Sequence, residues 1–158
     1  MLTEHEREEL ERAYRDLGPG LWRAIYAFTL GQREVTDDAI AHAFMEAGKR
    51  LASIRDLRSW LYAVAFREAT SDMRNHRRSE HLHQPSTPVA AQNDAVEVLD
   101  LARALSPRQR AVFVLRDLLG FTSSETAELL TTSEVAVRVH LHAAHRRLRA
   151  QLEEAERT

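Results

Sequence analysis

Residues 122–149 read TSSETAELLTTSEVAVRVHLHAAHRRLR. Thr122 and Glu125 have the spacing of a capping box, in which two side chains satisfy free backbone N–H groups at the start of a helix. The polar break Thr131-Thr132-Ser133 follows this short first helix, and Ser133 can cap a second, longer helix. A short helix, a tight break and a longer basic helix are the components of a helix-turn-helix.

The longer helix of this pair carries two different stripes of side chains. An apolar stripe that can pack on other helices consists of Val137, Leu141, Ala144 and Leu148. A polar stripe, shifted by one position, consists of Arg138, His142, His145 and Arg149. No acidic residue occurs between Val135 and Leu152. Because arginine bonds guanine edges and neutralises phosphates in the major groove, the pattern predicts binding to duplex DNA. The alternative is a solvated helix face.

Upstream of this pair, the sequence predicts two further helices and a linker. Pro107 suits the first position of a helix, where its missing donor costs nothing, and this helix is expected to end near Gly120. An earlier helix is expected to carry Val96, Leu99, Leu101 and Leu105. Residues 79–92 include Pro85-Ser86-Thr87-Pro88 and lack helical periodicity, which predicts a linker.

The N-terminal half predicts four helices. Thr3 and Glu6 form a second capping-box pattern, so a first helix is expected to run to about Leu17 and to end at Gly18-Pro19-Gly20. The second is expected to carry Leu21, Trp22, Ile25, Tyr26 and Phe28. The third follows the capping residues Thr36-Asp37-Asp38, with an apolar stripe of Ile40, Phe44 and Ala47. The fourth runs from Leu57 to about Arg74, with an apolar face of Leu57, Trp60, Leu61, Val64 and Ala65.

These patterns predict an all-α protein. The expected organisation is two small helical domains joined by a flexible linker, the C-terminal one a helix-turn-helix. The expected boundaries are residues 1–78, 79–93 and 94–158.

Composition narrows the classes of function. The chain has 158 residues, a formal net charge of −2 and no cysteine, which excludes disulfides and cysteine-based zinc sites. Without an apolar run of about 18 residues no membrane insertion is expected, and the chain is expected to be cytoplasmic. There is no glycine-rich phosphate loop and no nucleophile elbow, so neither an enzyme nor a cofactor is expected.

Two groups of side chains leave alternatives open. Tyr62 and Phe66 lie four residues apart near arginines, so they could stack on unpaired bases, or they could belong to the core. Histidines that invite a metal interpretation are His81, His83, His140, His142 and His145. No carboxylate or cysteine completes either set, so no metal is expected.

Several segments resemble one known family. Its C-terminal region is matched by LSPRQR at 105–110, VFVLRD at 112–117, GFT at 120–122, ETAELL at 125–130 and VRVHLHAA at 137–144. Its N-terminal domain is matched by Tyr14, Leu21, Asp38, Phe44, SWLYAVA at 59–65 and RNHRR at 74–78. Together these segments resemble the extracytoplasmic-function sigma factors of bacterial RNA polymerase.

The resemblance implies a sigma factor that directs RNA polymerase to specific promoters and initiates transcription. Its implied partners are core RNA polymerase, promoter DNA and an anti-sigma factor. Residues implied at the minus-thirty-five element are Ser133, Glu134, Val135, Arg138, His140, His142, Arg146 and Arg147. Those implied at the melted minus-ten element are Tyr62, Phe66, Arg67, Arg74, Arg77 and Arg78. Those implied on the polymerase-binding surface are Asp38, Ala41, His42 and Met45.

The chain also departs from the family pattern. Residues 38–44 lack the usual glutamine and glutamate of the polymerase-binding helix, and Gly48 replaces a common tryptophan. Arg67 replaces an asparagine, and Thr131 replaces the glycine of the helix-turn-helix turn. The altered helix supports an alternative function, an autonomous helix-turn-helix regulator that binds DNA but has lost polymerase docking.

Overall fold

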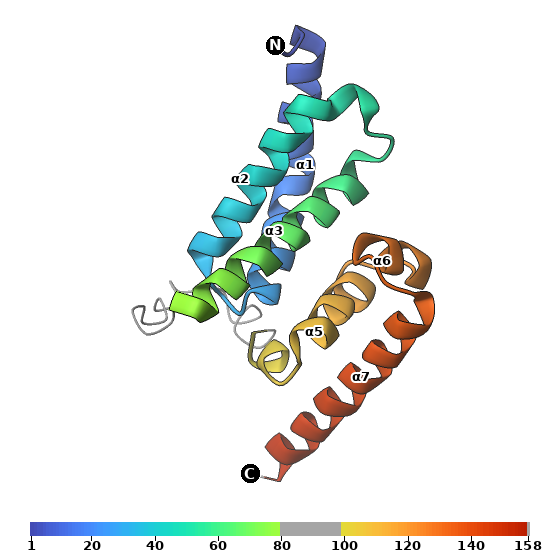
Figure 1. Ribbon diagram of the computed structural model, residues 1–158. Helices are drawn as coiled ribbons and strands as arrows, with labels where there is room; N and C mark the ends of the chain where they lie inside the picture. Colours follow the sequence, from blue (N-terminus) through green and yellow to red (C-terminus); the bar gives the residue numbers. More distant parts are fainter. Residues whose placement is uncertain (80–98, 158) are drawn as a thin grey trace. The chain divides into compact units, whose positions relative to one another are not determined.

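The computed structural model describes residues 1–79 and 99–157, and within these ranges all regular secondary structure is helical (Figure 1). The expected all-α class is therefore confirmed. The chain divides into two compact units, Met1–Ser86 and Thr87–Thr158. Val96 and residues 80–93 of the predicted linker, including His81 and His83, lie outside the described residues, whereas Ser79, expected in the linker, is the last residue of a helix. Within the described residues, no helix is both long enough and apolar enough to cross a membrane.

The N-terminal unit is built from three long helices, α1 (Glu4–Phe28), α2 (Arg33–Arg50) and α3 (Leu57–Ser79), with the short 3-10 turn η1 (Leu51–Ser53) before α3. In Figure 1 the three helices lie side by side, and α2 contacts both α1 and α3 along their lengths. Fully buried side chains from the three helices, among them Leu21, Ala39 and Leu61, form the core of this unit. Burial of these apolar surfaces is the main stabilising contribution.

Helix α1 does not end at Gly18-Pro19-Gly20, and this prediction was wrong. The expected first and second helices are one continuous helix of 25 residues. A proline inside a helix costs about 3 kcal/mol because one backbone hydrogen bond is lost and the ring clashes with the carbonyl four residues earlier. The apolar stripe of Ala13, Leu21, Ile25 and Phe28 continues in register across this point and is buried. Pro19 is exposed, on the side away from the core, so the tertiary packing of the stripe outweighs the local break.

Helix α2 begins at Arg33, before the predicted start after Thr36-Asp37-Asp38. Thr36 is fully buried, and its hydroxyl donates to the Gln32 carbonyl at 2.8 Å and lies 3.1 Å from the Thr29 hydroxyl. Asp37 accepts a hydrogen bond from the Trp22 indole at 2.8 Å. The two side chains that looked like caps therefore tie α2 to α1 and the segment after it.

Helix α3 begins at Leu57, as predicted, but continues beyond Arg74 to Ser79. On its predicted apolar face, Leu61 and Ala65 are buried, whereas Leu57, Trp60 and Val64 are partly buried.

The C-terminal unit has a helical stretch at residues 99–103, then α5 (Pro107–Phe113), the π-helical segment η2 (Val114–Leu118), α6 (Ser123–Leu129) and α7 (Glu134–Glu156). Pro107 occupies the first turn of α5, as predicted, behind a capping box between Ser106 and Gln109. The helical run of α5 and η2 ends at Leu118, shortly before Gly120. Gly120 has a φ of +73°, a conformation that glycine adopts at little cost.

Candidate nucleic-acid interface

The C-terminal unit contains the predicted helix-turn-helix, formed by α6, a tight turn and α7. The capping box at the start of α6 is present: Glu125 N–H donates to the Thr122 hydroxyl at 3.1 Å, and Thr122 N–H donates to the Glu125 carboxylate at 3.0 Å. Ser133 caps α7, accepting from Ala136 N–H at 3.1 Å. The three predicted capping residues of this hairpin are confirmed.

The turn itself is a Schellman motif, the 6→1 and 5→2 hydrogen-bond pair that closes many helices. Thr132 N–H donates to the Ala127 carbonyl at 2.9 Å, and Thr131 N–H donates to the Glu128 carbonyl at 3.3 Å. Thr131 has a φ of +53°, in the left-handed region that favours glycine. Thr131 therefore occupies a position whose backbone conformation favours glycine, the residue of the family pattern at this point.

The apolar stripe of α7 anchors the helix in the unit, as predicted. Val137 and Ala144 have no exposed area, Leu148 is 8% exposed and Leu141 is partly buried. Val137 belongs to a buried cluster with Val112 of α5 and Ala127 of α6. The other end of the stripe packs in a second cluster with Leu105. Two points of attachment fix which side of α7 faces outward.

At 3.6 residues per turn, the line directly opposite the buried stripe is formed by Val135, Val139, His142 and Arg146. We refer to these four residues as the outer ridge. All four are exposed, Val135 by 63% and Val139 by 60%. Sequence reasoning missed Val139. The signal that would have found it is its spacing of four residues from Val135 and two from the buried stripe.

The structure places the other minus-thirty-five candidates beside the outer ridge. Arg138 is exposed on one flank and lies 4.0 Å from the Glu134 carboxylate, one turn earlier. His140, partly exposed, and Arg147, exposed, lie on the opposite flank. The candidate set therefore lies on the outer ridge and on both flanks of one helix, and Ser133 serves as its cap.

His145 belongs to the predicted polar stripe but has a partner within the unit. Its Nε2 lies 2.5 Å from the Asp117 carboxylate of η2, and the side chain is 43% exposed. This contact fastens α7 to η2, so His145 acts as an anchor of the helix. Among the described residues, no three histidine, aspartate or glutamate side chains converge on a point that could hold a metal ion.

The two aromatic minus-ten candidates lie in the core of the N-terminal unit. Tyr62 is 3% exposed and Phe66 is 2% exposed. The ring centroids of Phe66 and Phe28 are 4.9 Å apart, so the two rings pack against each other. Burial raises the pKa of the Tyr62 phenol, although the Arg58 guanidinium, 5.5 Å over its ring, acts in the opposite direction. The core alternative is the one that fits these positions. Stacking on bases would require both rings to leave the core.

Arg67 is exposed on α3. Arg74, Arg77 and Arg78 belong to the same helix, but their side chains lie outside the described part of the structure. Of the six minus-ten candidates, Arg67 is therefore the one whose described side chain is exposed.

The polymerase-binding candidates share one face of α2. Asp38, Ala41 and Met45 are exposed, and His42 is partly exposed with its Nε2 3.6 Å from the Glu68 carboxylate of α3. Their spacing of three and four residues places them on adjacent turns.

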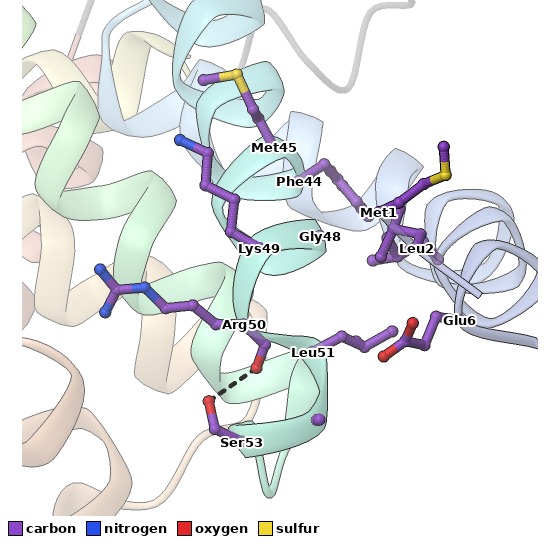
Figure 2. Close-up of a pocket in the computed structure, with 12 residues that line it drawn as sticks. Met1, Leu2, Glu6, Phe44, Met45, Gly48, Lys49, Arg50, Leu51 and Ser53 are labelled. Carbon is purple, nitrogen blue, oxygen red and sulfur yellow. Dashed lines mark hydrogen bonds between the residues drawn. The ribbon is translucent and has the colours of Figure 1, made fainter.

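Next to this face is an open hollow of about 840 Å³, and Figure 2 shows Met1, Phe44 and Met45 around it. Gly48 also lines the hollow. A Cβ atom at Gly48 would lie 3.5 Å from a Leu10 methyl group and 3.7 Å from one of Leu2. A tryptophan side chain there would therefore occupy the space that glycine leaves open.

Comparisons with known proteins agree with this arrangement. Residues 95–148 match the family model for sigma-70, region 4. The chain is 24% identical over 159 aligned residues to the extracytoplasmic-function RNA polymerase sigma factor BldN of Streptomyces coelicolor, covering 90% of this chain and 60% of that protein. It is 34% identical over 84 residues to the RNA polymerase sigma-E factor of Streptomyces avermitilis, covering 49% of this chain and 47% of that protein. The chain thus spans about half to three fifths of these relatives.

The fold is also found in a solved structure. The sigma factor RpoE of Bartonella quintana, crystallised with the anti-sigma factor NepR, matches with a TM-score of 0.78 at 20% identity. The match covers 92% of this chain and 98% of that one. Residues 95–148 thus match sigma-70 region 4, and the chain is similar over most of its length to an extracytoplasmic-function sigma factor.

Proposed function

We propose that this protein is a sigma factor that directs core RNA polymerase to specific promoters and has no catalytic activity of its own. One observation carries the proposal: α7 exposes Arg138, Arg146 and Arg147, and the helix-turn-helix to which it belongs falls in the sigma-70 region 4 match up to residue 148. The similarity to BldN over 90% of the chain supports a role for both units.

In this proposal α7 binds the minus-thirty-five element in the major groove. A helix-turn-helix places the N-terminal residues of its second helix on base edges, while flanking cations contact phosphates. Arg138 would reach base edges, and Arg146 and Arg147, two turns further on, would contact the DNA backbone. His140 and His142 lie between them, with Glu134 and Val135 at the start of the helix.

The N-terminal unit would serve the polymerase and the melted minus-ten element. The exposed face of α2, with Asp38, Ala41, His42 and Met45, is the proposed polymerase-binding surface. Arg67, with Arg74, Arg77 and Arg78 on the same helix, would hold the phosphates of the melted strand. Because Tyr62 and Phe66 are buried, we assign them to support of α3 and not to the bases.

We infer that an anti-sigma factor controls this activity. The support is the fold, which matches that of RpoE solved with its anti-sigma factor NepR. A protein of this function works where core polymerase and promoter DNA are found, in the bacterial cytoplasm.

The test is run-off transcription with purified core RNA polymerase of the organism that encodes this chain, with and without the protein, on genomic fragments. Discrete new transcripts that depend on the chain are expected, and aligning their start regions would give the promoter sequence. Absence of transcripts, with binding to duplex fragments retained, would instead support the autonomous regulator.

A further inference from the structure

We propose that Val135 and Val139 determine promoter specificity by contacting the C5-methyl groups of thymines in the upstream element. The inference rests on the proposed function and adds a chemical reason for part of its sequence preference. Both side chains are apolar, and neither packs in the core of the C-terminal unit.

Val135 and Val139 contribute little to the stability of the C-terminal unit. They are 63% and 60% exposed, on the side of α7 directly opposite the stripe that packs on α5 and α6. β-Branched residues also lose side-chain freedom in a helix, so alanine would suit both positions better if folding alone decided. Two such residues one turn apart on an otherwise polar surface indicate a contact outside the unit.

Their position on α7 indicates where that contact lies. Helix α7 begins at Glu134, so the two valines lie in its first two turns, the part of a recognition helix that contacts base edges. Four helical residues rise by about 6 Å, close to two base-pair steps of about 3.4 Å each. The pair can therefore reach bases about two steps apart along the groove.

The charges around the valines select DNA over an apolar protein segment. Arg138 lies beside them, 4.0 Å from the Glu134 carboxylate, the outer ridge continues into His142 and Arg146, and no acidic residue follows from Val135 to Leu152. An apolar partner would leave the cations beyond Arg138 without a counterpart, whereas phosphates on either side of a groove provide one. Within the major groove, the thymine methyl is the apolar group that valine can contact.

The experiment uses the full chain assembled with core polymerase and a promoter obtained in the run-off assay. Each thymine of the upstream element is replaced in turn by deoxyuridine, which differs by the loss of the C5-methyl group. We expect a loss of affinity of about fourfold at one or two positions, the value for burial of a single methyl-sized group.

The variants Val135→Ala and Val139→Ala assign each thymine to its valine. Each variant should bind the natural promoter about as weakly as the wild-type protein binds the corresponding deoxyuridine promoter, and should no longer distinguish the two bases at that position. Alanine favours helix formation, so both variants should fold, which circular dichroism can check. Arg157→Ala, at the far end of α7, is the control and should keep the full response to deoxyuridine.

The outcomes separate this inference from the proposed function. If no promoter is selected by the wild-type protein, both fail. If a promoter is selected but deoxyuridine has no effect at any position, or if its effect persists unchanged in both alanine variants, the methyl contact is wrong and the sigma-factor function stands.

Discussion

Leu30 and Thr131 have left-handed backbone conformations, with φ values of +58° and +53°. Each follows the end of a helix, α1 or α6, and each is part of a Schellman motif: Gly31 N–H donates to the Tyr26 carbonyl at 2.8 Å, as Thr132 N–H does to that of Ala127. The left-handed region brings Cβ close to the following carbonyl oxygen, at a cost of about 1–2 kcal/mol. For Thr131 this cost falls within the helix-turn-helix turn.

Thr131→Gly is expected to raise the free energy of unfolding of the C-terminal unit by about 1 kcal/mol, because glycine has no Cβ to clash in the left-handed conformation. The gain is limited because glycine loses more backbone entropy on folding than threonine does. Urea unfolding of the full chain, followed by circular dichroism, measures the change. Thr132→Gly is the matched control: Thr132 does not have a positive φ, so this variant should be less stable than wild type. Equal changes in the two variants would contradict the argument.

Arg138 is the residue at which specific readout can be separated from general attraction to DNA. Arg138→Ala is expected to weaken binding of the upstream element by about 1–3 kcal/mol if the guanidinium makes a bidentate contact to guanine. Fluorescence anisotropy with a labelled promoter duplex and the assembled polymerase measures this. Arg157→Ala removes the same charge at the end of α7 and should change binding little. Similar losses in both variants would indicate diffuse electrostatic attraction.

Among the elements, α3 shows how local polar groups define the start of a helix. Asp56, the residue before α3, accepts from the Ser59 hydroxyl at 2.8 Å and from Ser59 N–H at 3.3 Å. The hydrogen bond from the Ser59 side chain, followed by that from its backbone, lowers the pKa of the Asp56 carboxyl below its ordinary value of 3.8. A carboxylate in this position also interacts favourably with the helix dipole.

The sign of the resulting pH dependence follows from the lowered pKa. The charged carboxylate contributes stability that is fully present above pH 3.8 and is lost as the pH falls through the lower pKa of the folded state. Asp56→Asn should therefore be less stable than wild type at pH 7, with the difference shrinking below pH 3.8. Urea unfolding at pH 7, 4 and 3 measures it.

Ser59→Ala tests the cause of this dependence, because it removes the hydrogen bond that lowers the pKa most. It should reduce the pH-dependent part of the stability difference without removing the carboxylate. A difference between wild type and Asp56→Asn that stays constant with pH would mean that the carboxylate charge has no role at the start of α3.

At the scale of the whole molecule, positive and negative side chains are nearly equal in number but unevenly distributed along the chain. The chain has 22 lysines and arginines against 24 aspartates and glutamates, yet the stretch from Val135 to Leu152 has four arginines and no acidic residue. Affinity for DNA must therefore come from this local surface, because the net charge of −2 opposes binding to a polyanion.

Binding to promoter duplex should consequently weaken steeply with salt, with a slope of about −0.9 in log affinity against log salt for each phosphate neutralised. Arg146→Ala should reduce the magnitude of this slope by about 1. Titrations of the assembled polymerase between about 50 and 200 mM salt measure it. Arg103→Ala is the control: Arg103 belongs to the helical stretch at residues 99–103 and not to α7, and it pairs with Asp100 at 2.8 Å, so its removal should leave the slope unchanged. The same reduction in both variants would show that α7 is not the DNA-binding surface.

The predictions from sequence succeeded where the signal is local. The capping boxes at Thr3, Ser106 and Thr122 involve residues three apart, so the sequence specifies them directly, although only those at Thr3 and Thr122 were predicted. The buried stripe of α7 was predicted for the same reason, since helical periodicity fixes which residues share a face. The end of the first helix at Gly18-Pro19-Gly20 was predicted wrongly, because the local signal for a break is opposed by packing against residues distant in sequence.

By itself, the sequence determined the helical class of this protein, the helix-turn-helix and the basic surface of its second helix, because capping, periodicity and charge act between near neighbours. Only the tertiary structure decided that α1 continues through Pro19, that Tyr62 and Phe66 are buried, and that Asp117 holds His145. It also identified Val139, since exposure on the outer ridge depends on which face of α7 packs against α5 and α6. Each of these outcomes depends on contacts between elements, whose energies no short segment of sequence contains.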